Sequence, residues 1–404
     1  MKIVLINPPS PYLENDAAYP PSGLMYVAAA IEHLGHEVEI ADLTGGIDWR
    51  TAVSGLAADL FGITCVTPNF KIVQEIADRL PQDTPVVLGG VHPTFLPEDT
   101  LARIRCAAIV RGEAEIAIAE LLDDFQKGRL RRTYDGGLVP AAAIPRPSRH
   151  LVDLHKYRPG GEEAVPIYSS RGCPFNCNFC AKVTGRTYRM VPVPRVIEEI
   201  HEVMDRGFRH ILFGDDDIAI NRPRLRELLA AIRPLGLRFR LNQDARDIDD
   251  EAVRLAGEGG CREISFGIES GSQRMLDSMN KQSTVEANKR AIRVTRQHGL
   301  RARAYFLVNY PGENEQSVEE TLRFAEEARP DTWLLSSFAP LPGSDTFCNR
   351  ERYGITWLSP DWEDYYLVGR DGAFRSCFET AELTRVRQIH LHDKLFAGLK
   401  EILG

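Results

Sequence analysis

The sequence lacks three kinds of feature, and each absence narrows the classes of protein to consider. No apolar run reaches the roughly 20 residues that span a bilayer, so no membrane partner is expected. No basic stretch could neutralise a phosphate backbone, and the net charge is -8 with an isoelectric point near 5.8. Nucleic acid is therefore not expected as the main partner. The short basic cluster of Arg129, Arg131 and Arg132 is interpreted as a solvated loop.

Cysteine is also sparse, with eight residues in a chain of 404. The first residues are predicted to form a strand that ends at Pro8 and Pro9, not a secretion signal. We therefore expect a reducing, cytoplasmic location and no disulfide framework. Five cysteines are scattered, and most of them are interpreted as small buried hydrophobic residues. They are Cys65, Cys106, Cys261, Cys348 and Cys377.

The other three cysteines, Cys173, Cys177 and Cys180, form one C-x3-C-x2-C motif. Three thiolates from one tight loop can hold three corners of a cubane iron–sulfur cluster and leave the fourth iron open. Zinc prefers four ligands in paired C-x2-C groups, and no second pair exists in the sequence. The motif therefore predicts a 4Fe–4S cluster whose fourth iron can bind a substrate or cofactor.

The first part of the chain alternates short apolar runs with helical patterns, which predicts a doubly wound, Rossmann-like parallel sheet. The expected strands cover residues 3–6, 38–41, 60–64, 86–88 and 107–110. Such sheets bind ligands beyond the carboxyl ends of their strands. The small and polar residues expected there are Pro8, Ser10, Thr64, Thr67, Pro68, Asn69, Gly89, Gly90, His92, Arg111, Gly112 and Glu113. Four such loops on one edge predict a ligand site, although each alone would be an ordinary turn.

The second part of the chain predicts six further strand–helix units, at residues 166–170, 210–214, 237–242, 262–268, 301–308 and 333–337. Six units indicate a partial (β/α)6 barrel, with its active face at the carboxyl ends of the strands. We expect a first domain over residues 1–140, a linker over 141–164, a barrel over 165–345 and a short helical extension over 346–404. The cysteine loop follows the first strand and therefore lies on the active face.

Three strand ends of the barrel carry polar residues with more than one interpretation. Asp215, Asp216 and Asp217 repel one another, so they indicate a cationic ligand, or alternatively a solvated turn that caps a helix. Asn242 suits ribose or carboxylate recognition. Glu269 could contact a ligand or could be an acid favoured at a helix N-terminus, and both interpretations remain open.

The cysteine motif, with Phe179 before its last cysteine, resembles that of the radical S-adenosylmethionine (SAM) superfamily. The loops at residues 20–24, 67–69, 88–93 and 110–113 resemble the cobalamin-binding domain that precedes the barrel in many of these enzymes. The Asp-x-His-x-x-Gly signature of an axial histidine is absent, so His92 is expected to shape its loop or touch the corrin periphery. The resemblance covers roughly residues 3–345.

The resemblance implies three cofactors: a 4Fe–4S cluster on the cysteines, SAM and cobalamin. Asp215 is preferred over Asp216 as the contact to the amino group of SAM, and Asn309 stands where the family commonly has glycine. The residues that it implies for SAM are Phe179, Asp215, Asp216, Asn242, Glu269, Ser270, Val308 and Asn309. For cobalamin it adds Pro21, Ser22 and Gly23 to the strand-end residues of the first domain.

The resemblance also implies a function: formation of a 5′-deoxyadenosyl radical and methylation of an unactivated carbon, or of phosphorus, in a small or carrier-bound biosynthetic intermediate. A flavodoxin or ferredoxin would supply the electron. The alternative is a non-methylating radical reaction, such as ring contraction, cyclisation, sulfur transfer or oxygenation. A non-enzymatic cobalamin or redox sensor is disfavoured, because the sequence holds no output module such as a basic recognition helix. The aromatic residues of the extension either line the substrate pocket or only pack.

Overall fold

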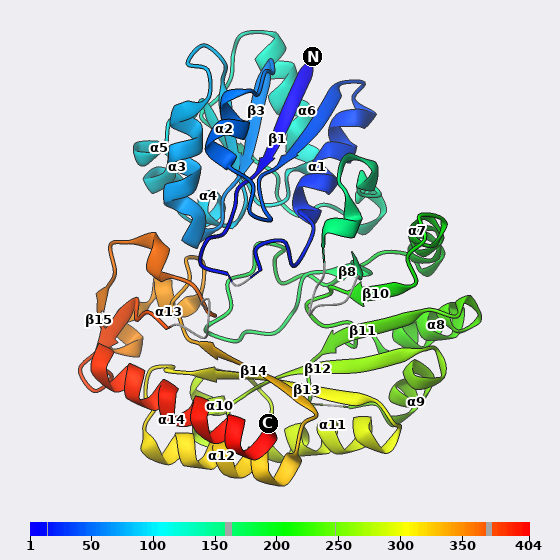
Figure 1. Ribbon diagram of the computed structural model, residues 1–404, viewed down its shortest axis with the longest axis vertical. Helices are drawn as coiled ribbons and strands as arrows, with labels where there is room; N and C mark the ends of the chain where they lie inside the picture. Colours follow the sequence, from blue (N-terminus) through cyan, green and yellow to red (C-terminus); the bar gives the residue numbers. More distant parts are fainter. Residues whose placement is uncertain (14, 158–163, 247, 369–373) are drawn as a thin grey trace. The chain divides into compact units, whose positions relative to one another are not determined.

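The computed structural model describes residues 1–13, 15–157, 164–246, 248–368 and 374–404 (Figure 1). Its contacts divide the chain into two compact units. The first unit contains Met1–Glu163 together with two short segments from later in the chain, Val183–Gly185 and Asp361–Asp364. The remaining residues form the second unit.

The first unit is built on a six-stranded, wholly parallel sheet in the order β2-β1-β3-β4-β5-β6. The strands are β1 (Lys2–Asn7), β2 (Glu37–Asp42), β3 (Leu60–Thr64), β4 (Val86–Gly89), β5 (Ala108–Arg111) and β6 (Thr133–Asp135). The chain order reverses between β1 and β3, which is where doubly wound sheets bind ligands. All carboxyl ends meet at one edge, as the sequence predicted.

Helices cover both faces of this sheet because alternate strand residues point to opposite sides (Figure 1). Val4 and Ile6 face a core with α3, whereas Ile3 and Leu5 face a core with α1 and α6. The helices are α1 (Ser22–His33), α2 (Trp49–Ser54), α3 (Phe70–Arg79), α4 (Val91–Phe95), α5 (Pro97–Arg103) and α6 (Ala114–Gln126). A 3-10 turn, η1 (Thr67–Asn69), precedes α3.

The predicted linker packs against the first unit, so the boundary expected near residue 140 does not coincide with a break in contacts. The backbone N–H of Ser148 donates to the carbonyl of Met25 at 3.0 Å. The Tyr157 hydroxyl donates to Asp42 Oδ2 at 2.6 Å, and Lys156 forms an ion pair with the same carboxylate. Burial opposes the charge of Asp42, but these two partners outweigh it and lower its pKa.

The second unit is built on a parallel sheet in the order β14-β13-β12-β11-β10-β7. Its strands are β7 (Val165–Ile167), β10 (His210–Phe213), β11 (Arg238–Gln243), β12 (Cys261–Glu269), β13 (Arg301–Val308) and β14 (Thr332–Ser337). They are paired in sequence order, with helices between them, which confirms the partial barrel. The helices are α7 (Val193–Asp205), α8 (Arg222–Ile232), α9 (Asp250–Glu258), α10 (Gln273–Ser278), α11 (Val285–Gln297) and α12 (Glu315–Ala328).

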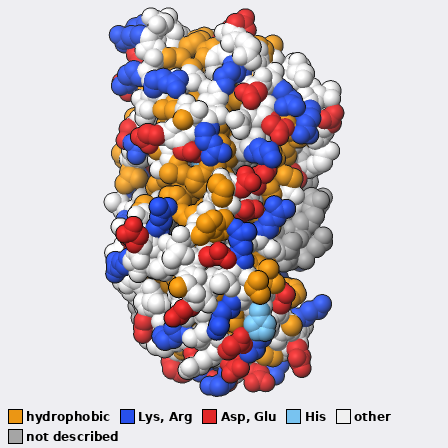
Figure 2. All heavy atoms as spheres, turned by 90° about the vertical axis from the view of Figure 1, so that its left-hand side faces the viewer, with side chains coloured by type: hydrophobic (Ala, Val, Ile, Leu, Met, Phe, Trp, Pro, Cys, Tyr) orange, Lys and Arg blue, Asp and Glu red, His pale blue; other side chains and the backbone are white. Residues whose placement is uncertain are grey.

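The C-terminal extension contains one long helix, α14 (Arg385–Leu403), which packs against α12 and β14. Before it come α13 (Asp345–Cys348), an antiparallel pair of β15 (Ile355–Leu358) with β16 (Phe378–Thr380), and the turn η8 (Trp362–Asp364). Among the described residues, no helix is long and apolar enough to cross a membrane. On the face drawn in Figure 2, basic and acidic side chains are interspersed, and neither sign forms one continuous area.

Candidate cofactor sites

The cysteine motif lies in a loop that follows β7 and the short strand β8 (Ser170–Arg171). Cys173 and Cys177 are buried, Cys180 is half-buried, and all three are free thiols. Burial raises the pKa of Cys180 to about 11, and the nearby Cys177 and Cys173 thiols add to the shift, so the three sulfurs are neighbours. The described residues hold no group of three ligands around a single metal ion. A cubane cluster needs no such group, since each thiolate ligates a different iron.

The cysteine loop is held by a turn at residues 278–282, directly after α10. The Asn178 backbone N–H donates to the Met279 carbonyl at 2.9 Å, and the Asn178 side chain donates to the Ser278 carbonyl at 3.1 Å. From the turn, Asn280 Nδ2 donates to the Asn176 carbonyl at 2.7 Å. Asn280 has a φ of 51°, in the left-handed region that Asn tolerates better than most residues. Sequence analysis did not identify this turn, because long-range contacts of polar residues leave no periodic pattern.

A buried charge network connects this turn to the ends of β11 and β12. Lys281 Nζ lies 3.3 Å from Asp244 Oδ2 and 3.3 Å from Glu269 Oε1, with its side chain only 9% exposed. Burial disfavours the charged amine, but Glu269 and Asp244 outweigh it and raise the pKa of Lys281. Arg246 binds Asp244 at 2.9 Å and lies 3.5 Å above the ring of Phe175 in the cysteine loop. Lys281 therefore remains cationic beside the predicted cluster loop.

Asp215 is the most buried of the three consecutive aspartates. Its carboxylate accepts hydrogen bonds from the Ser169 backbone at 3.1 Å, the Ser169 hydroxyl at 2.8 Å and the Ser170 hydroxyl. It is 2% exposed, and burial raises its pKa although these donors and Arg224 oppose the shift. Asp215 therefore anchors the entry to the cysteine loop. The preference for Asp215 as the contact to SAM is weakened, because three of its roughly four acceptor positions are used within the chain.

The other two aspartates point to different surroundings. Asp217 is buried, and its carboxylate accepts the Ala219 backbone N–H at 3.0 Å within its own turn, whereas Asn221 caps the following helix, so Asp217 is neither solvated nor the helix cap. Burial raises the pKa of Asp217 to about 6. Asp216 is exposed and close enough to Cys180 to raise the pKa of that thiol. Asp216 is therefore the exposed aspartate of this run, and it lies beside the cysteine loop.

The remaining residues predicted for SAM differ in accessibility. Phe179 and Asn242 are half-buried, and Asn242 Nδ2 lies 3.5 Å from the Phe213 carbonyl. Ser270 is buried, and its hydroxyl bonds to Thr321 of α12 at 3.2 Å, which ties the end of β12 to a helix. Val308, at the end of β13, is fully buried.

Asn309 is also fully buried and has a φ of 68°. Its Nδ2 donates to the Ser337 hydroxyl at 3.1 Å. Within the described part of the chain, its Oδ1 is a buried acceptor without a donor. An unsatisfied buried acceptor is costly, so this atom fits a site completed by the N–H group of a ligand.

Two of the predicted cobalamin loops are fastened to each other at the sheet edge. The Ser10 hydroxyl, after β1, donates to Asn69 Oδ1, after β3, at 2.9 Å. Gly90 has a φ of 104°, and a Cβ there would lie 2.8 Å from the Cys65 carbonyl oxygen. Gly90 therefore makes room for the chain's own backbone and not for a ligand. The half-buried residues Pro21, Ser22, Thr64, Pro68 and Gly89 and the exposed Gly23 retain accessible surface, whereas Pro8 and Thr67 are buried.

Glu113 and Arg111, predicted for the same site, also serve the chain itself. Glu113 Oε2 accepts the Val139 backbone N–H at 2.7 Å, and Glu113 is only 6% exposed. Arg111 Nε donates to the Thr94 carbonyl at 3.2 Å, and the Gly112 N–H donates to the Thr94 hydroxyl at 3.0 Å. These contacts set the shape of the β5 loop.

His92 is fully buried in the first unit. Its ring lies 4.7 Å from Phe70 and 5.1 Å from Trp362, and its Nδ1 lies 3.3 Å from the Thr67 hydroxyl. Burial lowers the pKa of His92 to about 4, although Asp99 opposes the shift. Because no atom of His92 is exposed, it has none to present to a corrin or to cobalt. Of the roles expected for His92, only the shaping of its loop fits this geometry.

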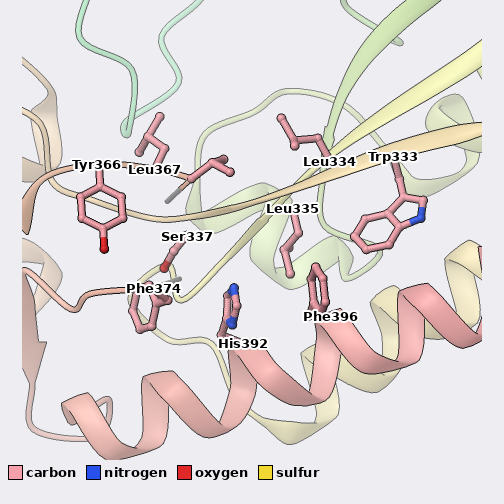
Figure 3. Close-up of a pocket in the computed structure, with 10 residues that line it drawn as sticks. Trp333, Leu334, Leu335, Ser337, Tyr366, Leu367, Phe374, His392 and Phe396 are labelled. Atoms are coloured by element: carbon pink, nitrogen blue, oxygen red, sulfur yellow. The ribbon is translucent and has the colours of Figure 1, made fainter. Parts of the chain in front are cut away.

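A separate cavity of about 190 Å³ lies between β14 and α14 (Figure 3). His392 stacks between Phe374 and Phe396, with ring centroids 5.3 and 6.1 Å away. The lining consists of Trp333, Leu334, Leu335, Ser337, Tyr366, Leu367, Val368, Phe374, His392 and Phe396. The aromatic residues of the C-terminal extension therefore have different surroundings. Tyr366 lines this cavity and Tyr365 is buried, whereas Trp362 belongs to the first unit.

Comparison with protein families agrees with this arrangement of two units. The B12 binding domain model matches residues 16–122, and the Radical SAM superfamily model matches residues 167–325. The chain is 32% identical to an uncharacterized methyltransferase of Pyrococcus horikoshii, covering 91% of this chain and 87% of that protein. It is 29% identical to an anaerobic magnesium-protoporphyrin IX monomethyl ester cyclase of Rubrivivax gelatinosus, covering 91% and 73%.

Among solved structures, the radical SAM methyltransferase TsrM of Kitasatospora setae, with cobalamin and a 4Fe–4S cluster bound, superposes with a TM-score of 0.72 at 19% identity. The match covers 100% of this chain and 89% of that one and supports the fold. The chain therefore belongs to the radical SAM superfamily, in its cobalamin-dependent branch. It is a radical SAM enzyme of the methyltransferase group, and its cofactors are a 4Fe–4S cluster, SAM and cobalamin.

Proposed function

We propose that this enzyme transfers a methyl group from SAM to an unactivated carbon, or to phosphorus, of a small or carrier-bound biosynthetic intermediate. The observation that carries the proposal is that one chain combines a B12-binding domain with a three-cysteine radical SAM barrel. The relative that is 32% identical over nearly the whole chain is named a methyltransferase, which supports this outcome over other radical reactions.

The three cysteines fit the iron–sulfur cluster in their chemistry. Three neighbouring free thiols supply the donor set of a cluster with one open iron. When bound, the cluster and SAM supply one-electron cleavage and radical formation, and cobalamin supplies methyl transfer. The work of this chain is to hold the cofactors, orient them and exclude water.

Within the SAM site we assign three roles to this chain. Asp216 accepts the amino group of SAM, because it is exposed and lies near Cys180. Lys281 balances negative charge at the ends of β11 and β12, where Asp244 and Glu269 meet it. Asn309 Oδ1 accepts an N–H group of the bound cofactor, which satisfies an otherwise unpartnered buried oxygen.

An external reductant is part of the proposal, because radical SAM chemistry consumes an electron that the chain does not generate. A flavodoxin or ferredoxin is the class of protein that we propose as donor. A second outcome is considered because a relative covering most of the chain is named a cyclase. That reaction would use the same cofactors but would leave no methyl group in the product.

The experiment that tests the proposal uses SAM labelled in its methyl group, with the anaerobically reconstituted holoenzyme and candidate substrates. We expect label in the product and formation of 5′-deoxyadenosine. The control replaces Cys173, Cys177 and Cys180 together by alanine, which should abolish the cluster and both products. Product without label would contradict methyl transfer and favour the cyclase-like outcome. A triple variant that kept four irons would contradict the cluster assignment.

A further inference from the structure

A short segment of the C-terminal extension completes the first unit. Residues 361–364 belong to that unit, although 175 residues of sequence separate Gly185 from Asp361. Trp362 Nε1 donates a hydrogen bond to Asp99 Oδ2 at 3.1 Å, and its ring packs against the core that contains α3. We call residues 361–364 the strap.

The strap contacts the loop that follows β4. The edge of the Trp362 ring meets His92, with centroids 5.1 Å apart and an interplanar angle of 73°. His92 lies in α4, two residues after Gly90, and the segment that follows β4 is the one whose Gly89, Gly90 and His92 were predicted to serve cobalamin. The strap therefore contacts this segment through the His92 ring.

The strap also contacts the loop that follows β3, both directly and through His92. His92 Nδ1 lies 3.3 Å from the hydroxyl of Thr67, and η8 itself packs against η1 and α3. Glu363 Oε2 lies 3.4 Å from Lys71 Nζ, at the start of α3. The strap thus contacts η1 in the β3 loop and the start of α3 directly after it.

The third contact reaches the loop that follows β1. The Tyr12 hydroxyl lies 3.5 Å from Glu363 Oε1. This loop also carries Ser10, which bonds to Asn69 of the β3 loop at 2.9 Å. Three of the four strand-end loops predicted to hold cobalamin therefore contact the strap.

Such loops are the flexible part of a doubly wound fold, and a ligand binds more tightly when its loops are already in the bound shape. A half-buried indole with a satisfied N–H provides a large, rigid contact for this purpose. We propose that the strap, with Trp362 at its centre, is a positioning element for cobalamin that fixes the β1, β3 and β4 loops. This inference rests on the proposed function only through the binding of cobalamin.

The test titrates hydroxocobalamin into the full-length, cluster-loaded protein and follows absorbance. We expect Trp362→Ala to weaken cobalamin binding at least tenfold. Trp362→Phe keeps an aromatic ring but loses the N–H donor to Asp99, so it should recover part of that affinity. Glu363→Gln, which loses the charge facing Lys71 but keeps the shape, should weaken binding by a smaller factor. These two milder variants keep the test decisive if Trp362→Ala does not fold.

Trp357→Ala is the matched control. Trp357 lies in β15 of the second unit, where Arg385 sits 3.9 Å above its ring. It removes the same side chain from the same extension and should leave cobalamin affinity unchanged. Iron content and SAM affinity should equal wild type in all variants, which separates positioning of cobalamin from a general loss of structure.

Two results would overturn the inference. If Trp362→Ala lowers the melting temperature but binds hydroxocobalamin as wild type does, the strap is only a structural fastening. If wild-type protein binds no cobalamin, the proposed function fails and the inference fails with it. The two failures are distinguishable, because the first leaves cobalamin binding by the wild type intact.

Discussion

At the scale of single residues, the three aspartates after β10 show how burial separates identical side chains. Asp215 has its oxygens occupied by Ser169 and Ser170, and Asp217 accepts a backbone N–H within its own turn. Asp216 is exposed. The sequence could predict that three adjacent carboxylates would not share one role, because of their repulsion. It could not predict which one would be buried at the entry to the cysteine loop, because that depends on Ser169 and Ser170, more than forty positions earlier.

The aspartates lead to a prediction about SAM binding. Asp216→Asn removes a charge but keeps the shape, and losing one charge-assisted hydrogen bond should cost about 1.5–3 kcal/mol of binding. This corresponds to a roughly ten- to hundredfold weaker affinity for SAM in a titration of the reconstituted protein. Iron content should be unchanged.

Asp215→Asn is the contrasting variant at the neighbouring position. An amide cannot accept the three hydrogen bonds from Ser169 and Ser170 as a carboxylate does, so the entry to the cysteine loop should loosen and iron content should fall. If Asp216→Asn binds SAM as wild type does, while Asp215→Asn loses SAM affinity at full iron content, the assignment of the two residues is reversed.

At the scale of elements, the cysteine loop depends on the 278–282 turn and on the ends of β11 and β12. The turn supplies hydrogen bonds to Asn176 and Asn178, and its Lys281 reaches both strand ends. Sequence analysis identified the thiols because their spacing is a local pattern. It did not identify Lys281, because a lysine in a polar turn looks like solvated surface until the fold buries it.

The network leads to a prediction about stability. Lys281→Met leaves Asp244 and Glu269 without their shared cation, and breaking a buried ion pair from one side costs about 3–5 kcal/mol. Denaturant unfolding of the apo protein should show this loss, and Lys281→Arg should retain most of the stability. Lys289→Met is the matched control, because Lys289 also meets two carboxylates, Glu286 and Glu327, but near solvent. The free energy of unfolding that Lys289→Met loses should stay below about 1 kcal/mol. Equal losses at the two lysines would contradict a buried network at Lys281.

At the scale of the whole molecule, both sheets were predictable, because the alternation of strands and helices and the polar residues at strand ends are local patterns in the sequence. The extent of the first unit was not. Residues 136–147 indicated a linker from their glycine, alanine and proline, yet Ser148 bonds to Met25 and Tyr157 bonds to Asp42. The strap and residues 183–185 join that unit only through tertiary contacts. The composition of a segment indicates the local stiffness of its backbone, but it does not indicate which surface the segment covers.

Several acidic residues of the second unit are buried and have raised pKa values. Burial raises the pKa of Asp217 to about 6 and that of Glu313 to about 7, and it raises the pKa values of Asp215 and Glu269 in the same direction. A raised pKa means that the folded state binds the proton more tightly than the unfolded state. The resulting stability is complete below the ordinary pKa values of 3.8 and 4.5 and is lost as the pH rises through about 6 and 7.

We therefore expect the melting temperature of the apo protein to fall as the pH rises from about 4.5 to 7. Each pKa unit is worth about 1.4 kcal/mol, so within this pH window Asp217 should account for roughly 2 kcal/mol of the loss and Glu313 for roughly 3 kcal/mol. In Glu313→Gln the amide oxygen can still accept the Ser317 hydroxyl, now 2.6 Å from Glu313, but it carries no charge. That variant should flatten the decline, and adding Asp217→Asn should flatten it further. Glu315→Gln is the control, because the Glu315 side chain is 43% exposed and Lys394 lowers its pKa, which places its titration below this window. A wild-type melting temperature that stayed constant from pH 4.5 to 7, or a decline that persisted in the double variant, would show that these acids do not govern the stability of the fold.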